Sequence, residues 1–167
     1  GSSWGTLSSF SSAPAILAMT SYVGRAVAAG NFPSLTSTGG TATNIASWTG
    51  TELKPFGTGT NANVRALKAF NPTIFSHTLV VGGDFTTAGG VAANRIATWN
   101  ENDLFGIPGW APLGNGFNNN VAAIERFNNQ IIAGGIFSAS GATSLNRIAL
   151  WNGTAWQPLG SGLNNSV

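Results

Sequence analysis

The side chains that could perform acid–base or metal chemistry are few in this chain, and they are scattered along it. The 167 residues contain one histidine, no cysteine and five acidic residues: Glu52, Asp84, Glu101, Asp103 and Glu125. A catalytic centre needs titratable groups that converge, and a metal centre needs several ligands at short spacing. His77 lies alone in an inserted polar turn, which favours a surface residue over a base or a ligand. The sequence therefore predicts no catalytic residue, no metal site and no cofactor.

Two acidic positions admit a second interpretation. Asp84 belongs to a repeated motif, but its counterparts there are Asn31 and Ile136, so the position accepts an apolar side chain. We therefore expect a turn residue at Asp84 rather than a metal ligand. Glu101 and Asp103 share an inserted hairpin and could hold a Ca²⁺ ion weakly, since calcium takes several oxygen ligands. A solvated loop explains the same pair, and both alternatives stay open.

A period of about fifty residues organises the rest of the chain. A glycine-rich motif ends in an aromatic residue three times, at Phe32, Phe85 and Phe137. Each copy is followed by a strand-like segment that ends in a tryptophan, at Trp48, Trp99 and Trp151. The last two copies also share a double glycine and an arginine: Gly83 with Arg95, and Gly135 with Arg147. Recurrence in the same frame predicts that these residues build the structure rather than bind a ligand, with the arginines bonding carbonyls between repeats.

Each repeat divides into four short strand-like pieces without helical periodicity. In the clearest copy these pieces cover residues 121–127, 130–137, 147–151 and 156–159. A polar loop at 138–144 separates the second piece from the third, and Asn152-Gly153 predicts a type I′ hairpin between the third and fourth. The apolar run at 130–137 is typical of a strand covered on both faces. Pro158 cannot donate a ladder hydrogen bond, so the fourth strand should lie at a sheet edge.

The composition excludes several classes of protein. Only 7% of the residues are charged, against roughly 25% in an ordinary globular protein, whereas 43% are hydrophobic. The net charge is +2 and the basic residues are dispersed, so nucleic-acid binding is not expected. No stretch approaches the roughly 20 apolar residues that span a bilayer, and residues 13–19 are interpreted as a core strand. Abundant Ser, Thr, Asn and Gly favour a secreted or cell-surface location.

The two ends of the chain fall within the repeat pattern. Trp4-Gly5-Thr6-Leu7 matches the fourth strand of a repeat, and residues 160–167 match the linker 114–121 that elsewhere leads into a next first strand. The predicted fold is all-β: an array of three four-stranded antiparallel propeller-type blades plus an orphan N-terminal edge strand, forming an incomplete ring or an open assembly. The expected divisions are the orphan strand at 1–10, repeats at about 13–60, 61–117 and 118–163, and a C-terminal linker at 160–167.

Residues 82–100 and 134–167 carry a resemblance to a known class of repeats. The double glycine before an aromatic residue resembles the kelch repeat, and the longer pattern is similar to the cortical-marker and delta-60 type repeats of secreted surface proteins. The resemblance implies β-propeller blades and an extracellular or wall-associated setting, and it implies no particular ligand. It also raises galactose oxidase, but Tyr22 and His77 are each single and cysteine is absent, so that copper site is excluded here.

Three functions are compatible with this pattern. The first is a non-enzymatic structural or adhesive protein that assembles with further copies of itself, or further repeats of a longer chain, into a filament, sheath or surface layer. Trp4-Gly5-Thr6-Leu7 is then the candidate assembly strand, completing a blade begun elsewhere. The second is a lectin-like module in which Trp110 and Trp156 stack on sugars. The third is a non-catalytic segment of a larger propeller enzyme.

Two sequons offer possible glycan attachment in a secreted protein. Asn152-Gly153-Thr154 and Asn164-Asn165-Ser166 fit the Asn-X-Ser/Thr acceptor for N-glycosylation, so Asn152 and Asn164 are candidate sites. Both lie in expected turns, where asparagine is also favoured for its backbone geometry. The two interpretations stay open.

Overall fold

The computed structural model describes residues 15–32, 34–37, 40–70, 77–101 and 109–164, and in these residues the regular structure is entirely β-strand. The first sheet contains β1 (Ala15–Tyr22), β2 (Arg25–Asn31), β5 (Ile45–Trp48) and β6 (Leu53–Pro55). The second contains β7 (Val64–Phe70), β8 (Thr78–Gly83), β11 (Ile96–Asn100) and β12 (Gly109–Pro112). The third contains β13 (Val121–Phe127), β14 (Gln130–Gly135), β17 (Ile148–Trp151) and β18 (Trp156–Pro158). The predicted all-β array of four-stranded antiparallel sheets is confirmed.

Strand order within each sheet follows the sequence, and neighbouring strands run antiparallel. The fourth strand of each sheet lies at an edge and contains a proline, at Pro55, Pro112 and Pro158. This placement confirms the prediction, because an edge position leaves the missing proline N–H without consequence for the ladder.

The chain between the second and third strands of each sheet forms a small hairpin, which the sequence interpretation missed. The three hairpins are β3 (Leu35–Ser37) with β4 (Gly40–Ala42), β9 (Thr87–Ala88) with β10 (Val91–Ala92), and β15 (Ala139–Ser140) with β16 (Thr143–Ser144). Residues 138–144 are therefore not a plain loop. Strands of two or three small residues are too short to show a period-2 pattern, which is why the sequence did not reveal them.

The predicted type I′ turn at Asn152-Gly153 is wrong. Gly153 has a φ of 100°, but Asn152 is not among the residues with positive φ, and both central residues of a type I′ turn need it. Trp151 pairs with Trp156, so the loop contains residues 152–155. The Asn152 Oδ1 atom accepts hydrogen bonds from the main-chain N–H groups of Thr154 and Ala155, each at 2.9 Å, and thereby stabilises the wider turn.

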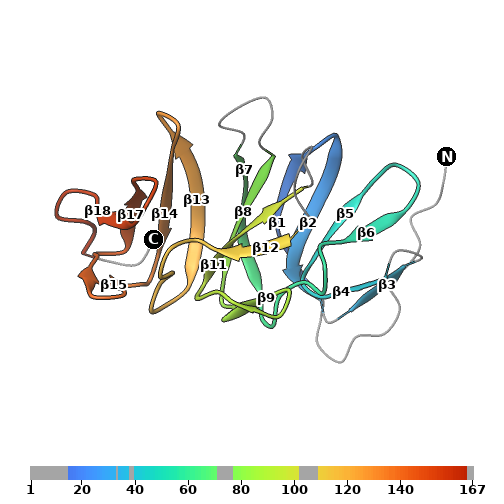
Figure 1. The fold of residues 1–167 in the computed structure, drawn as a ribbon, viewed down its shortest axis with the longest axis horizontal. Helices are drawn as coiled ribbons and strands as arrows, with labels where there is room; N and C mark the ends of the chain where they lie inside the picture. The colour runs from blue at the N-terminus through green and yellow to red at the C-terminus, as the bar shows by residue number, and fades with distance from the viewer. Residues whose placement is uncertain (1–14, 33, 38–39, 71–76, 102–108, 165–167) are drawn as a thin grey trace.

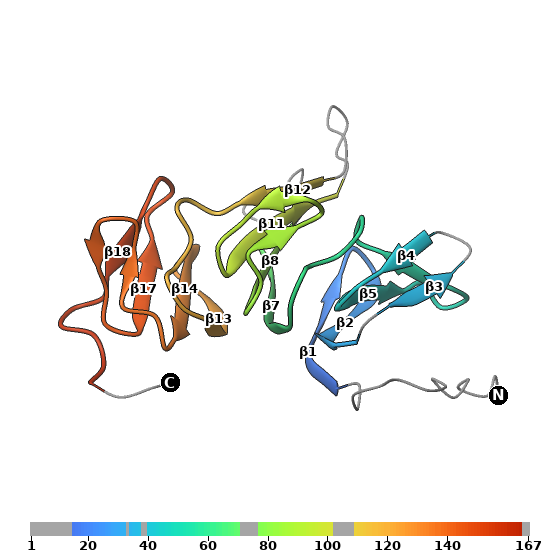
Figure 2. The ribbon, with the colours of Figure 1, turned by 90° about the horizontal axis from the view of Figure 1, so that it is seen from below.

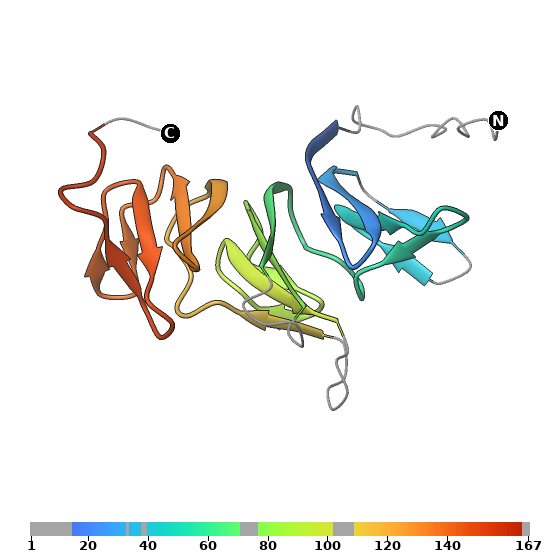
Figure 3. The ribbon, with the colours of Figure 1, turned by 90° about the horizontal axis from the view of Figure 1, so that it is seen from above.

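The three sheets stand side by side in sequence order and form an open, bent row (Figure 1). Views turned by 90° show that the first strands β1, β7 and β13 lie along the inner side of the bend, with the fourth strands toward the outside (Figures 2 and 3). β7 contacts both β1 and β13. The row does not close on itself within the described residues.

The hydrophobic cores lie between consecutive sheets. The core between the first and second sheets contains Val27 and Ile45 from one side and Val81 from the other. The core between the second and third sheets includes Val80 from one side and Ile131 from the other. Each sheet is thus stabilised by its neighbours, as in repeat proteins whose units bury their surfaces only by stacking.

Successive residues of β8 serve the two cores in turn. Leu79 and Val81 belong to the core shared with the first sheet, whereas Val80 belongs to the core shared with the third, and all three are fully buried. This alternation follows from the period of two in side-chain direction along a strand. β8 is therefore covered on both faces. The strand for which this was predicted, at residues 130–137, is covered on one face only, so that prediction is wrong for its other face. In the third sheet Ile131 is buried but Ile132 is only half-buried, because its face has no neighbour among the described residues.

Candidate assembly interface

The first strand of each later sheet supplies two apolar side chains that insert against the preceding sheet. Val64 and Leu67 of β7 belong to the core shared with the first sheet. Val121 and Ile124 of β13 belong to the core shared with the second sheet. The pairs are equivalent by register, since Val64 and Val121 pair with the second glycine of each motif. One stacking geometry is therefore used twice within the chain.

Gly82 explains how closely the third sheet approaches the second. A Cβ atom at this position would lie 2.6 Å from Val121 Cγ1 and 2.9 Å from Ile124 Cδ1, both closer than carbon atoms normally come. The absence of a side chain thus leaves a recess that the two apolar side chains occupy. Ala29 is the equivalent residue in the first sheet and is fully buried.

β1 carries the equivalent residues, and no sheet among the described residues lies against them. Ile16 pairs with Gly30 and Met19 pairs with Ala28, which makes them the equivalents of Val64 and Leu67. Ile16 is 51% exposed and Met19 is 68% exposed, whereas Val64 is fully buried. The prediction of a core strand at residues 13–19 is therefore wrong in burial: residues 15–19 are strand, but of their side chains only Ala18 packs against a core, and the others are exposed. Residues 13 and 14 lie outside the described residues.

The third sheet presents a complementary apolar face on the opposite side of the array. Side chains alternate in direction along a strand, and Ala133 and Ala149 point into the core between the second and third sheets. The side chains next to them therefore point away from that core: Ile132, Ile148 and Leu150. Ile132 and Ile148 correspond by register to residues of the second sheet that are fully buried by the third. In the third sheet they are only half-buried.

A second element of each stacking contact is a tryptophan that packs on a connector glycine. A Cβ atom at Gly57 would lie 3.5 Å from Trp99 Cζ3, and one at Gly114 would lie 2.6 Å from Trp151 Cζ3. At Gly160, the equivalent residue after the third sheet, no atom lies within 4 Å of such a Cβ.

Trp48 is the first-sheet equivalent of these tryptophans, and the residues that precede the first sheet lie outside the described part of the chain. It is 39% exposed, whereas Trp99 is 8% exposed. Of the three equivalent tryptophans only Trp99 is buried, since Trp151 is half-buried. In the part of the chain that the structure describes, Trp48 is thus partly exposed at one end of the array and Gly160 has open space beside it at the other.

An asparagine in each connector binds the turn of the sheet that follows. The Asn61 Oδ1 atom accepts hydrogen bonds from the main-chain N–H groups of Thr86, at 2.9 Å, and Thr87, at 3.0 Å. Asn118 does the same with Ser138, at 2.9 Å, and the residue after it, at 3.1 Å. Asn164 stands at the equivalent position after the third sheet and is exposed. No such turn follows it among the residues that the structure describes.

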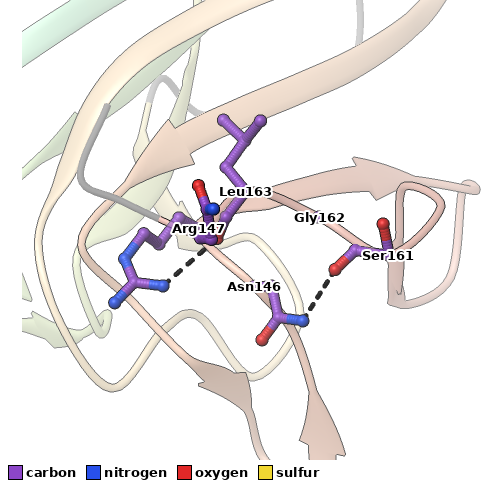
Figure 4. Close-up of a pocket in the computed structure, with 6 residues that line it drawn as sticks. Asn146, Arg147, Ser161, Gly162 and Leu163 are labelled. Atoms are coloured by element: carbon purple, nitrogen blue, oxygen red, sulfur yellow. Dashed lines mark hydrogen bonds between the residues drawn. The ribbon is translucent and has the colours of Figure 1, made fainter.

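A shallow hollow surrounds this last connector (Figure 4). Its lining is formed by Asn146, Arg147, Ser161, Gly162, Leu163 and Asn164. Asn146 donates from Nδ2 to the Ser161 carbonyl at 2.7 Å, and Arg147 donates from Nη1 to the Leu163 carbonyl at 3.2 Å.

Leu163 shows what normally fills this place. Its equivalent in the preceding connector, Phe117, is buried and stacks on Phe137 of the next sheet with ring centroids 4.0 Å apart. Leu163 is exposed because no further sheet covers it among the described residues. The hollow therefore corresponds to the place where the third sheet packs on the preceding connector in the contact between the second and third sheets.

The repeated glycines and arginines have backbone roles that each repeat shares. A Cβ atom would lie 2.1 Å from the Asn63 carbonyl oxygen at Gly83, and 2.1 Å from the Asn120 carbonyl oxygen at Gly135, so only glycine fits. Arg95 and Arg147 have φ values of 68° and 63°, and Asn44 in the first sheet has 65°. The sequence interpretation missed this shared left-handed backbone, although the exchange of arginine for asparagine was a signal for it.

The two arginine side chains donate to main-chain carbonyls. The Arg95 guanidinium bonds the Asp84 carbonyl of its own sheet, where the sequence predicts a bond between repeats. Arg147 reaches the connector at Leu163. Asp84 itself is more than a turn residue, because its carboxylate holds the Arg65 guanidinium through two contacts of 2.8 Å. The hydrogen bond with Asp84 raises the pKa of Arg65 above its ordinary value.

A network of polar contacts connects the first sheet to the second. The Tyr22 hydroxyl donates to the His77 carbonyl at 2.6 Å and accepts from the Glu101 N–H at 3.0 Å. Arg25 pairs with the Glu101 carboxylate at 2.6 Å. Burial raises the pKa of Tyr22 to about 12, because the phenolate would lose its hydration there. Glu101 thus has a structural partner, and Asp103 lies outside the described residues.

Lys68 and Glu125 form the corresponding charged contact between the second and third sheets. The Lys68 ammonium is the main cause that holds the pKa of Glu125 below its ordinary value. Among the residues the structure describes, no three His, Cys, Asp or Glu side chains come together to hold a metal ion. Nor is any helix long and apolar enough to span a membrane found in that part of the chain.

The tryptophans proposed for sugar stacking have structural contacts. Trp156 is 1% exposed and donates from Nε1 to the Leu113 carbonyl at 3.0 Å, so it cannot present a ring face to a sugar and that prediction is wrong. Trp110 is half-buried, donates to the Phe56 carbonyl at 2.8 Å and packs edge-on against Trp99.

The remaining predicted sites fall at exposed or undescribed positions. Asn152 and Asn164 are both exposed, and their glycosylation stays a prediction. Trp4-Gly5-Thr6-Leu7, the candidate assembly strand, lies outside the described residues. Comparison with protein-family models, with curated proteins and with solved structures finds no significant match.

Proposed function

We propose that this chain is a non-enzymatic structural or adhesive protein of the cell surface or extracellular space, which assembles with further copies or further repeats through its end sheets. The supporting observation is the exposure of Ile16 and Met19 at positions whose counterparts are buried between internal sheets. Exposed apolar surface of this kind marks an interaction site. The low charge and the abundance of Ser, Thr, Asn and Gly support the extracellular setting.

The geometry of the internal contacts gives the proposal its physical basis. A unit that buries its apolar residues only against neighbours leaves one unburied face at each end of any array. The first and third sheets carry those faces here. Several of the charged side chains that the structure describes pair with one another across and within sheets, as Arg25 does with Glu101 and Arg65 with Asp84. That arrangement supports a structural role for the charged residues.

Size-exclusion chromatography with light scattering tests assembly directly. We expect a mass above the 17.0 kDa of one chain, rising with protein concentration and falling again on dilution. Circular dichroism on the same samples shows whether the associated protein retains its β-structure. A folded chain that stays at the mass of one copy at every concentration would contradict the proposal.

A further inference from the structure

We propose that two copies of this chain dock head to tail, the first sheet of one copy covering the outer face of the third sheet of the other. This inference rests on the proposed function and specifies the contact that performs it. We call Ile16, Met19 and Trp48 the head surface, and Ile132, Ile148 and Gly160 the tail surface. The head surface carries the inserting half of the internal stacking contact, and the tail surface carries the receiving half.

The apolar side chains of β1 match the outer face of the third sheet. Ile16 and Met19 occupy the register of Val121 and Ile124, which insert into the second sheet. Ile132 and Ile148 occupy the register of Val80 and its neighbour Ile96, which receive them. Docking would therefore remove four exposed or half-buried apolar side chains from water, which is the main favourable term in association.

Trp48 and Gly160 form the second part of the contact. The internal contacts place Trp99 near Gly57, and Trp151 against Gly114, at distances that leave no room for a side chain at Gly114. Trp48 is partly exposed and Gly160 faces open space, at the two positions where a third such pair would form. A large aromatic side chain that enters a recess is the usual energetic anchor of an interface.

The polarity of the contact follows from the difference between the two surfaces. The inserting side chains lie on the head surface, whereas the receiving face and the open connector glycine lie on the tail surface. A symmetric pair of identical surfaces would place inserting residues against inserting residues. The contact is therefore heterologous, and each copy uses one surface for each of its two neighbours.

One substitution blocks each surface while leaving the fold intact. Met19→Lys places a charge in the head surface at a residue that is 68% exposed in the single chain. Gly160→Asn fills the space reserved for Trp48, and asparagine tolerates the φ of 60° at that position. Gly24→Asn is the matched control, because Gly24 has a φ of 69°, also faces open space and lies outside both surfaces.

Light scattering on the separate and mixed variants reads the polarity. We expect Met19→Lys alone and Gly160→Asn alone to remain single chains, with association weakened about tenfold or more, the effect of removing an interface anchor. Their equimolar mixture should form a complex of one copy of each, at twice the mass of one chain. The Gly24→Asn variant should associate as the unsubstituted protein does.

Four results would overturn the inference. Full association of either blocked variant alone would mean that the contact is symmetric or lies elsewhere. A mixture that stays monomeric would mean that the two surfaces do not meet. If the unsubstituted protein associates and both blocked variants associate equally well, the proposed function stands and this contact fails. If the unsubstituted protein never associates, both fail together.

Discussion

The third sheet can pack closely on the second only because Gly82 has no side chain, and one substitution can test this. In Gly82→Ala, the added methyl group would begin 2.6 Å from Val121 Cγ1 and 2.9 Å from Ile124 Cδ1, where carbon atoms normally lie about 3.5–4.0 Å apart. Val121 is β-branched and stiff at χ1, so it cannot rotate away freely. The sheets must separate or the side chains must leave their preferred rotamers.

The expected loss of stability follows from two opposing terms. Overpacking of this kind costs about 1–3 kcal/mol. Alanine also restricts the unfolded chain relative to glycine, which returns about 0.4–1 kcal/mol, and no positive φ at Gly82 opposes that gain. We therefore expect the free energy of unfolding of Gly82→Ala to fall by about 1–2 kcal/mol.

Urea denaturation followed by tryptophan fluorescence measures this difference. Val121→Ala should be destabilising by itself, because it leaves a cavity in the core between the second and third sheets. In the double variant with Gly82→Ala, the loss in the free energy of unfolding should be smaller than the sum of the two separate losses by about 1 kcal/mol. The new methyl group then occupies the space that Val121→Ala leaves empty. An unchanged stability in Gly82→Ala, or simple additivity in the double variant, would refute the packing argument.

Two further predictions concern polar contacts between sheets. Because burial raises the pKa of Tyr22 to about 12, the unfolded chain loses this proton first, and the free energy of unfolding should fall as pH rises from about 10 to about 12. Urea denaturation across that range should show a shallower fall in Tyr22→Phe, and equal slopes would contradict the burial effect. Asn118→Ala removes the bonds to the next turn and should cost about 1–2 kcal/mol. Asn119→Ala, whose side chain bonds only its neighbour's N–H among the described residues, should change stability by less than about 0.5 kcal/mol, and equal losses would exclude a special role for Asn118.

The repeat pattern was enough to predict the sheets, because each strand is marked by a local signal. The break between the pieces at 121–127 and 130–137 and the edge prolines both act within a few residues. The structure places a turn with positive φ at Asn128 and Asn129, and Pro158 in an edge strand. The small hairpins escaped because their strands are shorter than any periodic pattern.

The candidate interface could not be predicted from local signals. Ile16 and Met19 look like core residues in the sequence, and only the register shows that their equivalents are buried by a preceding sheet. Trp156 looked accessible because it lies on an edge strand, but its ring turns into the core beside Trp151. Exposure depends on which sheet lies next to which, and that arrangement is set by contacts between distant segments.

Placing the cores between sheets, rather than within them, bears on how such a gene can change its length. Recombination between two repeats would delete or add one complete period, and the new junction would bring together surfaces that already fit. The products would differ in span while each contact stayed the same, so selection could adjust reach without reshaping any interior.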